Sequence, residues 1–328
     1  MAGMTANSTP FEDIRHLVMS VGEPHKDARE AVKTQLDSFV PDLQPFGECA
    51  DALLWLAQWQ GRADPAIERP LIAVFAGSQG VAKGILGGDI VEGAKARVAS
   101  LTQGAAGVRG MAASFGAAFK VYEMGIEYPS ADMTEEPSLS ERDCAAAIAF
   151  GMEVVAEGAD LIVLGNAGYG SAAAAAAIAH GLFGGAPAYW AGGKGDGAKA
   201  RIAAVEKATA LHREHLSDPL HVLRCFGGRD IAGMIGAIIA ARHQSIPIIL
   251  DGYIVCAAAA VLNEISSDAI AHCYAGHVSS EPGHGALLDR LGLKPLLDLG
   301  IGVGDGTGAT LAMGTLQAAA NGLKTSGV

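Results

Sequence analysis

Aromatic residues, cysteines and long hydrophobic runs are scarce in this 328-residue chain, which also has no block of like charges. Phe, Trp and Tyr together make up 5% of the residues, although 50% are hydrophobic. Lys and Arg number 23 against 35 Asp and Glu, which gives a net charge of −12 at pH 7. Because nucleic-acid-binding surfaces need clustered cations, this balance argues against a nucleic-acid partner.

The five cysteines are odd in number and widely separated, and they lack the CxxC or His/Cys spacing of metal sites. They are Cys49, Cys144, Cys225, Cys256 and Cys273. This pattern predicts reduced, buried thiols in a cytoplasmic protein. Residues 1–30 carry early acidic residues and no apolar core, so we expect no signal peptide.

No hydrophobic run has the length and continuity of a membrane span. Residues 161–193 contain no charged residue apart from the ionisable His180, but Gly165, Gly168 and Gly170 break the stretch. A span needs about 20 continuous apolar residues. We therefore predict a buried strand, a loop and a buried helix in this segment.

Small residues are abundant instead, with 44 glycines and several alanine-rich segments of helical length. Four short apolar runs alternate with these segments, and glycine follows each run. The runs are 71–75, 119–124, 161–164 and 246–250. Uniformly apolar strands that alternate with helices predict a parallel sheet covered on both faces, with ligands at the carboxyl ends of the strands.

The N-terminal 65 residues contain no strand candidate. Their polar, amphipathic segments predict helices at 11–20, 26–39 and 48–60, and a final Ala-rich helix is predicted at 310–323. We therefore predict two domains. Residues 66–309 form an α/β domain, and residues 1–65 plus 310–328 form a small helical domain from both chain ends.

Residues 161–171 (LIVLGNAGYGS) predict a strand, a glycine loop and a helix N-terminus in that order. Free backbone N–H groups and the positive end of a helix dipole favour an anion such as phosphate there. The spacing fits neither GxGxxG nor GxxxxGKS/T, so a dinucleotide loop and a P-loop are both excluded. A plain tight turn explains the segment equally well.

Asp305 lies on a glycine-flanked loop within LLDLGIGVGDGTG (296–308). Its carboxylate could accept a proton as a general base. Alternatively, Asp305 or Thr307 could cap the helix that follows. Asp251, at the end of an apolar run, could bond a sugar hydroxyl or cap the next helix.

Two histidines flank a Pro-Gly turn in GHVSSEPGH (276–284). His277 and His284 have no acidic or cysteine partner at ligand spacing other than Glu281, so we predict no metal site. A hydrogen-bonded loop that supports a ligand is the favoured interpretation.

Several longer sequence motifs occur in order along the second half of the chain. They are AAAIAFG (145–151), DPLHVL (218–223), GGRDIA (227–232), PIILDG (247–252), GHVSSEPGH (276–284) and PLLDLG (295–300). In these motifs the chain resembles the nicotinate-nucleotide:dimethylbenzimidazole phosphoribosyltransferases, which build the lower-ligand nucleotide of cobalamin. The resemblance implies a Rossmann-like parallel sheet flanked by helices, a small helical domain from both chain ends, a homodimer, and no metal or other cofactor.

The reaction that the resemblance implies moves a phosphoribosyl group from nicotinate mononucleotide to a nitrogen of 5,6-dimethylbenzimidazole. Nicotinate and an α-ribazole phosphate are the products. The family's base is the glutamate of GEGTGA, which reads GDGTGA here over 304–309, so Asp305 is the implied general base. Aspartate is one methylene shorter, which withdraws its oxygens by about 1–1.5 Å unless the loop shifts and can cost on the order of 100-fold in rate.

The resemblance also implies which residues bind the nucleotide and its phosphate. The family loop GEMGIGNTT reads GNAGYGSAA over 165–173, so its three glycines persist and Ser171 is the remaining hydroxyl. Arg201 stands where the family has a lysine, after a shortened glycine loop at 192–197. The implied set is Gly168, Tyr169, Gly170, Ser171, Gly193, Gly195, Arg201, Ser279 and Gly304.

The largest departure from the family concerns the acceptor base. The serine, tyrosine and glutamine of the benzimidazole pocket are replaced at about Leu86, Gly88 and Gly93. Two hypotheses follow. The chain is an active phosphoribosyltransferase that uses Asp305, or a catalytically silent relative that binds a ligand or serves as the helper subunit of a heterodimer.

Overall fold

The computed structural model describes residues 9–39, 45–193 and 196–325. Its strands are β1 (Pro70–Ala76), β2 (Ala118–Glu123), β3 (Leu161–Asn166), β4 (Ile248–Leu250), β5 (Cys273–His277) and β6 (Pro295–Leu297). Its α-helices are α1 (Pro10–Met19), α2 (Lys26–Asp37), α3 (Cys49–Gln60), α4 (Ala82–Leu86), α5 (Ile90–Thr102), α6 (Gly107–Ser114), α7 (Glu141–Gly151), α8 (Ser171–Phe183), α9 (Pro187–Ala191), α10 (Asp196–Leu211), α11 (Pro219–Phe226), α12 (Arg229–His243), α13 (Gly252–Asn263), α14 (His284–Leu291) and α15 (Thr307–Thr325). Short 3-10 helices are η2 (Met152–Glu157), η3 (Arg213–His215) and η4 (Ser267–Ile270).

The strands form one six-stranded parallel sheet in the order β2-β1-β3-β4-β5-β6. The chain moves outward from β1 to β2 and then returns past β1 to β3, so the winding direction reverses there. Ligands of doubly wound sheets bind at such a switch point, outside the carboxyl ends of the strands. The expected Rossmann-like α/β fold is therefore confirmed.

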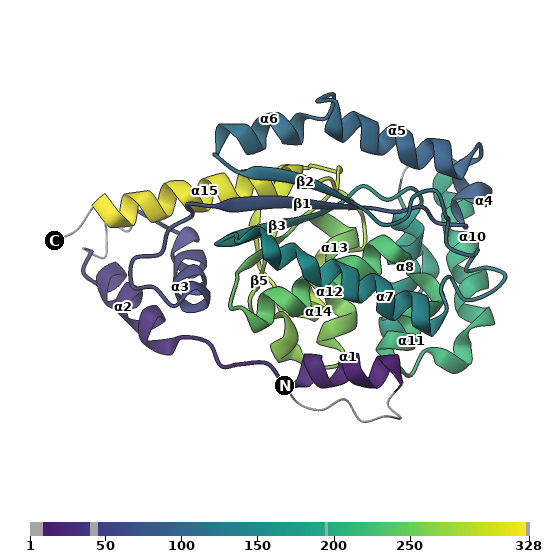
Figure 1. Cartoon of the computed structure of the whole chain (residues 1–328), viewed down its shortest axis with the longest axis horizontal. Coiled ribbons are helices and arrows are strands. Elements are labelled where there is room, and N and C mark those ends of the chain that lie inside the picture. The colour runs from purple at the N-terminus through teal and green to yellow at the C-terminus, as the bar shows by residue number, and fades with distance from the viewer. Residues whose placement is uncertain (1–8, 40–44, 194–195, 326–328) are drawn as a thin grey trace.

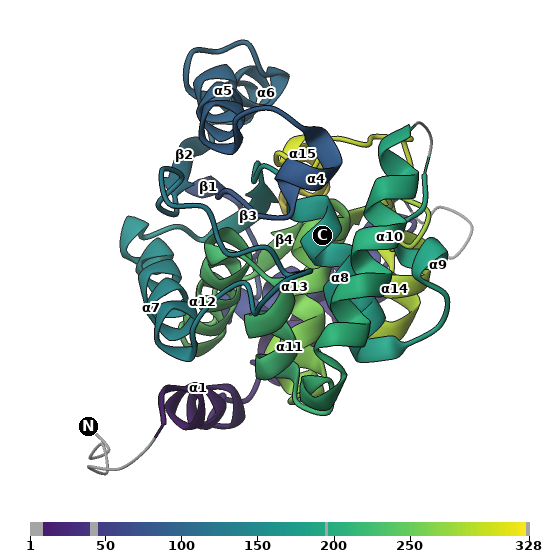
Figure 2. The ribbon, with the colours of Figure 1, turned by 90° about the vertical axis from the view of Figure 1, so that its right-hand side faces the viewer.

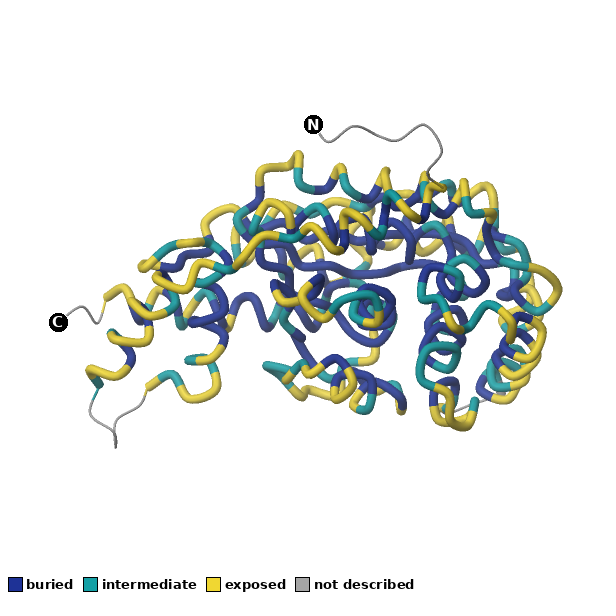
Figure 3. Tube along the Cα trace, turned by 90° about the horizontal axis from the view of Figure 1, so that it is seen from below, coloured by how far each residue is buried: buried dark blue, intermediate teal, exposed yellow. Residues whose placement is uncertain are grey.

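Helices cover both faces of the sheet, as Figures 1 and 2 show. Alternate strand residues enter two separate cores. Leu71, Ala73 and Phe75 pack with α7, α8, α12 and α13, whereas Ile72 and Val74 pack with α3, α5, α6 and α15. Because both faces are covered, β1 and β3 are buried along their whole length, which explains their uniformly apolar sequences. Figure 3 shows this buried trace through the middle of the molecule.

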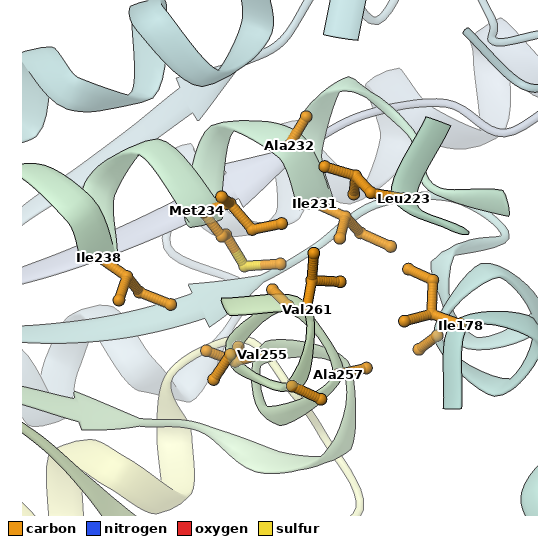
Figure 4. Packing of buried hydrophobic residues seen from close by; sticks show 14 of the residues in the cluster. Ile178, Leu223, Ile231, Ala232, Met234, Ile238, Val255, Ala257 and Val261 are labelled. Carbon is orange, nitrogen blue, oxygen red and sulfur yellow. The ribbon is translucent and has the colours of Figure 1, made fainter. Parts of the chain in front are cut away.

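The core below the sheet is built from small and branched side chains at short helix–helix distances. Figure 4 shows side chains of α8, α11, α12 and α13 meeting there: Ile178, Leu223, Ile231, Ala232, Met234, Ile238, Val255, Ala257 and Val261. Glycines bring α7 and α12 together, since a Cβ on Gly151 or Gly236 would collide with a backbone carbonyl of the other helix. Part of the glycine excess therefore serves close packing rather than ligand binding.

The helices near the chain ends lie in two places. Helices α2 and α3 pack beside the far end of α15, where the Gln35 side chain donates to the Leu323 carbonyl at 2.9 Å. Helix α1 lies instead against α7 and α11, with Phe11 on the His221 ring and Arg15 bonded to Asp218. Figure 1 shows this separation. The predicted boundary at 309/310 falls inside α15, and the division into two domains stays a prediction.

The four expected strands, the three N-terminal helices and the final helix are confirmed to within a few residues. Residues 161–193 form β3, a loop, α8 and α9, as the glycine pattern predicts. Strands β5 and β6 were not predicted from apolar runs. In the described ranges no helix is both long enough and apolar enough to cross a membrane.

Candidate active site

The loops after β1 and β3 meet at the switch point and are tied together by their backbones. Gln79 N donates to the Tyr169 carbonyl at 3.0 Å, and Tyr169 N donates to the Gly77 carbonyl at 2.8 Å. These bonds extend the contact between the two strands beyond their ends. They fix the start of α8 against the loop that leads into α4.

A buried carboxylate holds the same two loops from below. Asp230, in the first turn of α12, is fully buried and accepts three side-chain hydrogen bonds. Its Oδ1 accepts from Gln79 Nε2 at 2.7 Å, and its Oδ2 accepts from Asn166 Nδ2 at 2.8 Å and Ser171 Oγ at 2.6 Å. A buried charge needs such donors, and the N-terminus of α12 also favours it. Asp230 is therefore a structural centre of the site.

The hydroxyl of Ser171 is engaged in this network, and the residue is fully buried. The expectation of a hydroxyl that faces phosphate is thus replaced by a structural role for this side chain. Gly168 is required for the same reason, because a Cβ there would collide with the Asp230 carboxylate and the Ser171 hydroxyl. Gly170 has a φ of 93°, a left-handed conformation that glycine adopts without strain.

The backbone amides of this loop divide into engaged and free groups. Those of Gly168 and Tyr169 donate to Asn166 Oδ1 and the Gly77 carbonyl. Within the described residues, no acceptor receives the N–H groups of Gly170, Ser171 and Ala172 at the start of α8. The donors that remain for an anion are therefore those of the helix N-terminus.

Asp305 lies on a loop pressed onto the end of β3. Asn166 N donates to the Gly304 carbonyl at 2.7 Å, and a Cβ on Gly165 would lie 2.7 Å from Gly306 N. Asp305 Oδ1 accepts from Thr307 N at 3.1 Å and Thr307 Oγ at 2.6 Å. Its Oδ2 accepts no hydrogen bond from the described part of the chain. Burial raises the pKa of Asp305, and the nearby charge of Asp251 adds to the increase although the Thr307 bonds oppose it.

Asp251 caps a helix, but not the one that follows it in sequence. Its carboxylate accepts from Gly306 N at 2.8 Å and Ala309 N at 2.7 Å, at the N-terminus of α15. It also lies 3.2 Å from His277 Nε2. Burial lowers the pKa of His277, but the hydrogen bond and charge of Asp251 more than offset this, so the net shift is upward. The Asp251 carboxylate is thus engaged by groups of the protein itself, whereas Asp305 lines the cleft.

Ser279 and His284 form a buried pair at the end of β5. His284 Nδ1 lies 2.8 Å from both Ser279 N and Ser279 Oγ, and its Nε2 lies 3.3 Å from Cys256 Sγ. Burial, aided by the charge of His277, lowers the pKa of His284 to about 3, so the ring is neutral. Because Nδ1 accepts from the amide, the Ser279 hydroxyl donates to it as well, and the serine oxygen is left to accept from a ligand.

The histidine-rich loop is therefore hydrogen-bonded within the protein, as favoured from the sequence. Across the described ranges, no group of three or more His, Cys, Asp or Glu side chains is placed to hold a metal.

A cleft of ≈ 370 Å³ opens beside these groups. Its lining comprises Arg97, Ser100, Leu101, Ala106, Asn166, Ala167, Ala172, Ile254, Glu281, Gly302, Val303, Gly304 and Asp305. It thus joins the start of α8, the Asp305 loop and one face of α5. A larger depression of ≈ 660 Å³ around 23–28 and Gly61 contains none of the predicted site residues.

Of the predicted nucleotide-binding residues that the structure describes, Gly304 alone lines this cleft. The others lie outside the lining: Gly168, Tyr169, Gly170, Ser171, Gly193, Arg201 and Ser279. Arg201 donates from Nε to the Ala191 carbonyl at 2.9 Å and from Nη2 to the Gly192 carbonyl at 2.8 Å, which ties α10 to the end of α9. Gly193 lies beside it, with φ 132°. Gly195 falls outside the described residues.

The three positions expected at the acceptor pocket are also dispersed. Leu86 is 48% exposed, and a Cβ on Gly88 would meet only open space. A Cβ on Gly93 would lie 2.5 Å from Tyr169 Cε2, so the tyrosine ring fills the place of a side chain at 93. None of the three lines the cleft.

Asp230, Arg97 and Glu281 were not predicted from the sequence. Asp230 stands in the word GGRDIA, and an acidic residue at a helix start inside such a word was an available signal. Arg97 follows Gly93 by one helical turn, which places both on one face of α5. That spacing alone gave no reason to select it.

The fold and the cleft together define an α/β protein with unengaged helix amides near its switch point and a carboxylate, Asp305, in the cleft wall. Comparisons with known proteins agree with that class. The model of the DBI_PRT phosphoribosyltransferase family matches residues 21–326. The nicotinate-nucleotide–dimethylbenzimidazole phosphoribosyltransferase of Rhizobium rhizogenes (strain K84) is 46% identical over 97% of this chain and 95% of its own length. The enzyme of the same name from Sinorhizobium medicae (strain WSM419) is 44% identical over the same shares.

A solved structure agrees as well. The crystal structure of the nicotinate-nucleotide–dimethylbenzimidazole phosphoribosyltransferase from Thermus thermophilus superposes with a TM-score of 0.83 at 30% identity. The match covers 91% of this chain and 96% of that one. This chain belongs to the nicotinate-nucleotide:dimethylbenzimidazole phosphoribosyltransferase family, which confirms the resemblance found in its sequence.

Proposed function

We propose that this chain transfers the phosphoribosyl group of nicotinate mononucleotide to a nitrogen of a benzimidazole-type base. The bond between C1′ and the nicotinate nitrogen breaks, and a bond between C1′ and the acceptor nitrogen forms. Asp305 takes the proton that the acceptor's second nitrogen loses. Nicotinate and α-ribazole phosphate leave the site.

One observation carries this assignment beyond family membership. Asp305 lines the ≈ 370 Å³ cleft with Oδ2 unengaged by described residues, while burial raises its pKa. A general base works best when its pKa approaches the operating pH, because it then binds the proton more strongly while still being ionised. The position of Asp305 in the cleft wall and the direction of its pKa shift both support this role.

The nucleotide is proposed to lie with its phosphate at the start of α8. The unengaged amides of Gly170, Ser171 and Ala172 lie at the N-terminus of α8, and Ala172 lines the cleft. Ser279, whose oxygen can only accept, suits a ribose hydroxyl that donates. Gly193, Gly195 and Arg201 remain nucleotide-binding proposals on the sequence resemblance.

The silent-relative alternative is not favoured, because relatives that match 97% of the chain carry the enzyme's name. We also infer a homodimer in the cytoplasm, on the family resemblance. Leu86, Gly88 and Gly93 stay proposed as acceptor-side positions, which requires that the acceptor approach α4 and α5.

The test is to incubate the purified protein with nicotinate mononucleotide and 5,6-dimethylbenzimidazole and to measure both products by chromatography. We expect equal amounts of nicotinate and α-ribazole phosphate. Absence of nicotinate above background with a panel of benzimidazoles, purines and phenols would reject the proposed function.

A further inference from the structure

Arg97 is the cationic side chain in the wall of the cleft. It extends from α5 toward the loop after β3, where Nη1 donates to the Gly168 carbonyl at 2.7 Å. Its guanidinium carbon lies 5.2 Å from the centre of the Tyr169 ring. These two contacts hold the guanidinium against the loop that leads into α8, and Arg97 shares the cleft lining with Ala172 of that helix.

In the part of the chain that the structure describes, Arg97 forms no salt bridge. Burial lowers the pKa of Arg97, although the charge of Asp230 acts in the opposite direction. The Asp230 carboxylate already accepts from Gln79, Asn166 and Ser171. Arg97 is exposed and has one neutral acceptor, the Gly168 carbonyl, so most of its five donors remain for another group.

The second candidate cation is differently placed. Arg201 donates from Nε and Nη2 to two backbone carbonyls at the end of α9, and it does not line the cleft. A cation held this way serves mainly to close a helix. The two arginines therefore differ in which one can reach a ligand in the cleft.

We propose that Arg97 binds the phosphate of the nucleotide together with the amides of Gly170, Ser171 and Ala172, and so supplies the cation expected at position 201. This inference rests on the proposed function and names a specificity-determining residue of the same site. Phosphate is favoured over the nicotinate carboxylate because Arg97 is attached to Gly168, two residues before those amides. A planar guanidinium suits a phosphate through paired hydrogen bonds.

The residue pair Gly93 and Tyr169 explains how this arrangement is possible. Without a side chain at 93, the Tyr169 ring lies flat along α5 and reaches under the guanidinium one turn later. The ring thereby holds Arg97 toward the cleft. The missing side chain at 93 is thus linked to the placement of the Arg97 charge beside the loop after β3.

The test measures binding by calorimetry with three probes: nicotinate mononucleotide, nicotinate riboside, which lacks the phosphate, and nicotinamide mononucleotide, which lacks the carboxylate. Arg97→Met keeps the stem and removes the charge, and Arg97→Lys keeps a charge without the planar fork. Lys95→Met is the matched control, because Lys95 lies on the same helix but is paired with Glu92 and does not line the cleft.

We expect Arg97→Met to raise the Kd of both mononucleotides by about 10- to 100-fold and to leave riboside binding unchanged. Arg97→Lys should fall between, and Lys95→Met should match the wild type. Equal weakening of mononucleotide and riboside would show a purely structural role and overturn the proposal. So would a loss confined to nicotinate mononucleotide, since Arg97 would then hold the carboxylate.

Binding and turnover are read separately, so the two proposals can fail independently. Wild-type protein that binds the mononucleotide but releases no nicotinate rejects the proposed function and leaves Arg97 in place. Active protein whose Arg97→Met variant binds like the wild type rejects the role of Arg97 alone. If Arg97→Met does not fold, Arg97→Lys decides, and unchanged affinity in it overturns the proposal.

Discussion

At the scale of single residues, two aspartates near the start of α15 make different hydrogen bonds. Asp251 is fully buried, and its two oxygens accept hydrogen bonds from the amides of Gly306 and Ala309. Asp305 accepts hydrogen bonds from Thr307 with Oδ1, and its Oδ2 accepts none from the described residues. Because the helix amides have their acceptor in Asp251, Asp305 is not needed as the main cap and can exchange a proton with a ligand.

Removing the proton-accepting oxygen of Asp305 should slow the chemical step. We expect Asp305→Asn to lower kcat by about 100- to 10,000-fold with little change in the KM of nicotinate mononucleotide. Burial raises the pKa of Asp305. The wild-type kcat should therefore fall as the pH decreases, and the midpoint of this fall should lie above the usual aspartate pKa of about 3.9. Steady-state rates across pH check both statements, and an Asn variant as fast as wild type would contradict them.

Restoring the family's glutamate is the matched variant. Asp305→Glu should raise turnover, since it returns the missing methylene to the base. An unchanged rate would locate the slow step in the acceptor pocket instead.

The candidate base could be predicted from sequence, but the fate of the neighbouring hydroxyl could not. Asp305 stands in a short motif whose glycines flank it directly. Ser171 also stands in a motif, but its partner Asp230 is 59 residues away. A side chain's hydrogen-bond partner over that separation follows from tertiary packing, which local patterns do not record.

At the scale of elements, the contact between α5 and the loop after β3 depends on one missing side chain. Helix α5 approaches through Gly93, the Tyr169 ring packs on it, and Arg97 bonds to the loop carbonyl. Three contacts thus join two segments that flank the cleft.

Filling position 93 should separate these segments. Gly93→Ala places a Cβ where the Tyr169 ring lies, and we expect it to destabilise the protein by about 1–3 kcal/mol. Combining it with Tyr169→Leu should recover part of that loss, because the smaller side chain vacates the space. Urea unfolding of the wild type, both single variants and the double variant measures the coupling. Additive effects would contradict the proposed packing.

Burial alone does not decide which strands the sequence predicts, because β2 was predicted although most of its residues are not buried. Residues of β1 and β3 are buried throughout, so their apolar runs are continuous. Strand β5 reads CYAGH, with a glycine and a histidine that serve the site, and edge strand β6 has three partly exposed residues. The glycine and histidine of β5 and the three-residue length of β6 therefore removed the hydrophobic signal from these two strands, whereas the other edge strand, β2, keeps Phe119, Val121 and Tyr122.

At the scale of the whole molecule, two buried histidines link stability to pH. Burial lowers the pKa of both His272 and His284 to about 3, with the nearby charge of Arg242 or His277 contributing. Unfolding exposes them to water, where their usual pKa is near 6.5. The unfolded state then binds more protons between these values, so stability is lost as pH falls below about 6.5.

This linkage should appear as acid sensitivity of the whole fold. Between about pH 7.5 and 5.0 each histidine costs about 2 kcal/mol, so the pair costs about 4 kcal/mol. The variant His272→Leu should lose about half of that dependence, and His16→Gln, at an exposed position, should lose none. Urea midpoints at the two ends of this pH range measure the difference. Identical pH dependence in the wild type and His272→Leu would refute the linkage.

The anchoring of α15 also has a consequence for the order of events during synthesis. Asp251 is made with the centre of the sheet, whereas its two amide partners follow 55 and 58 residues later. Until they leave the ribosome, β4 can be buried only together with a carboxylate that lacks these donors, which is costly. We therefore expect the sheet to be completed only after the segment that carries Asp305 has been made, so that closure of the core and placement of the proposed base occur together.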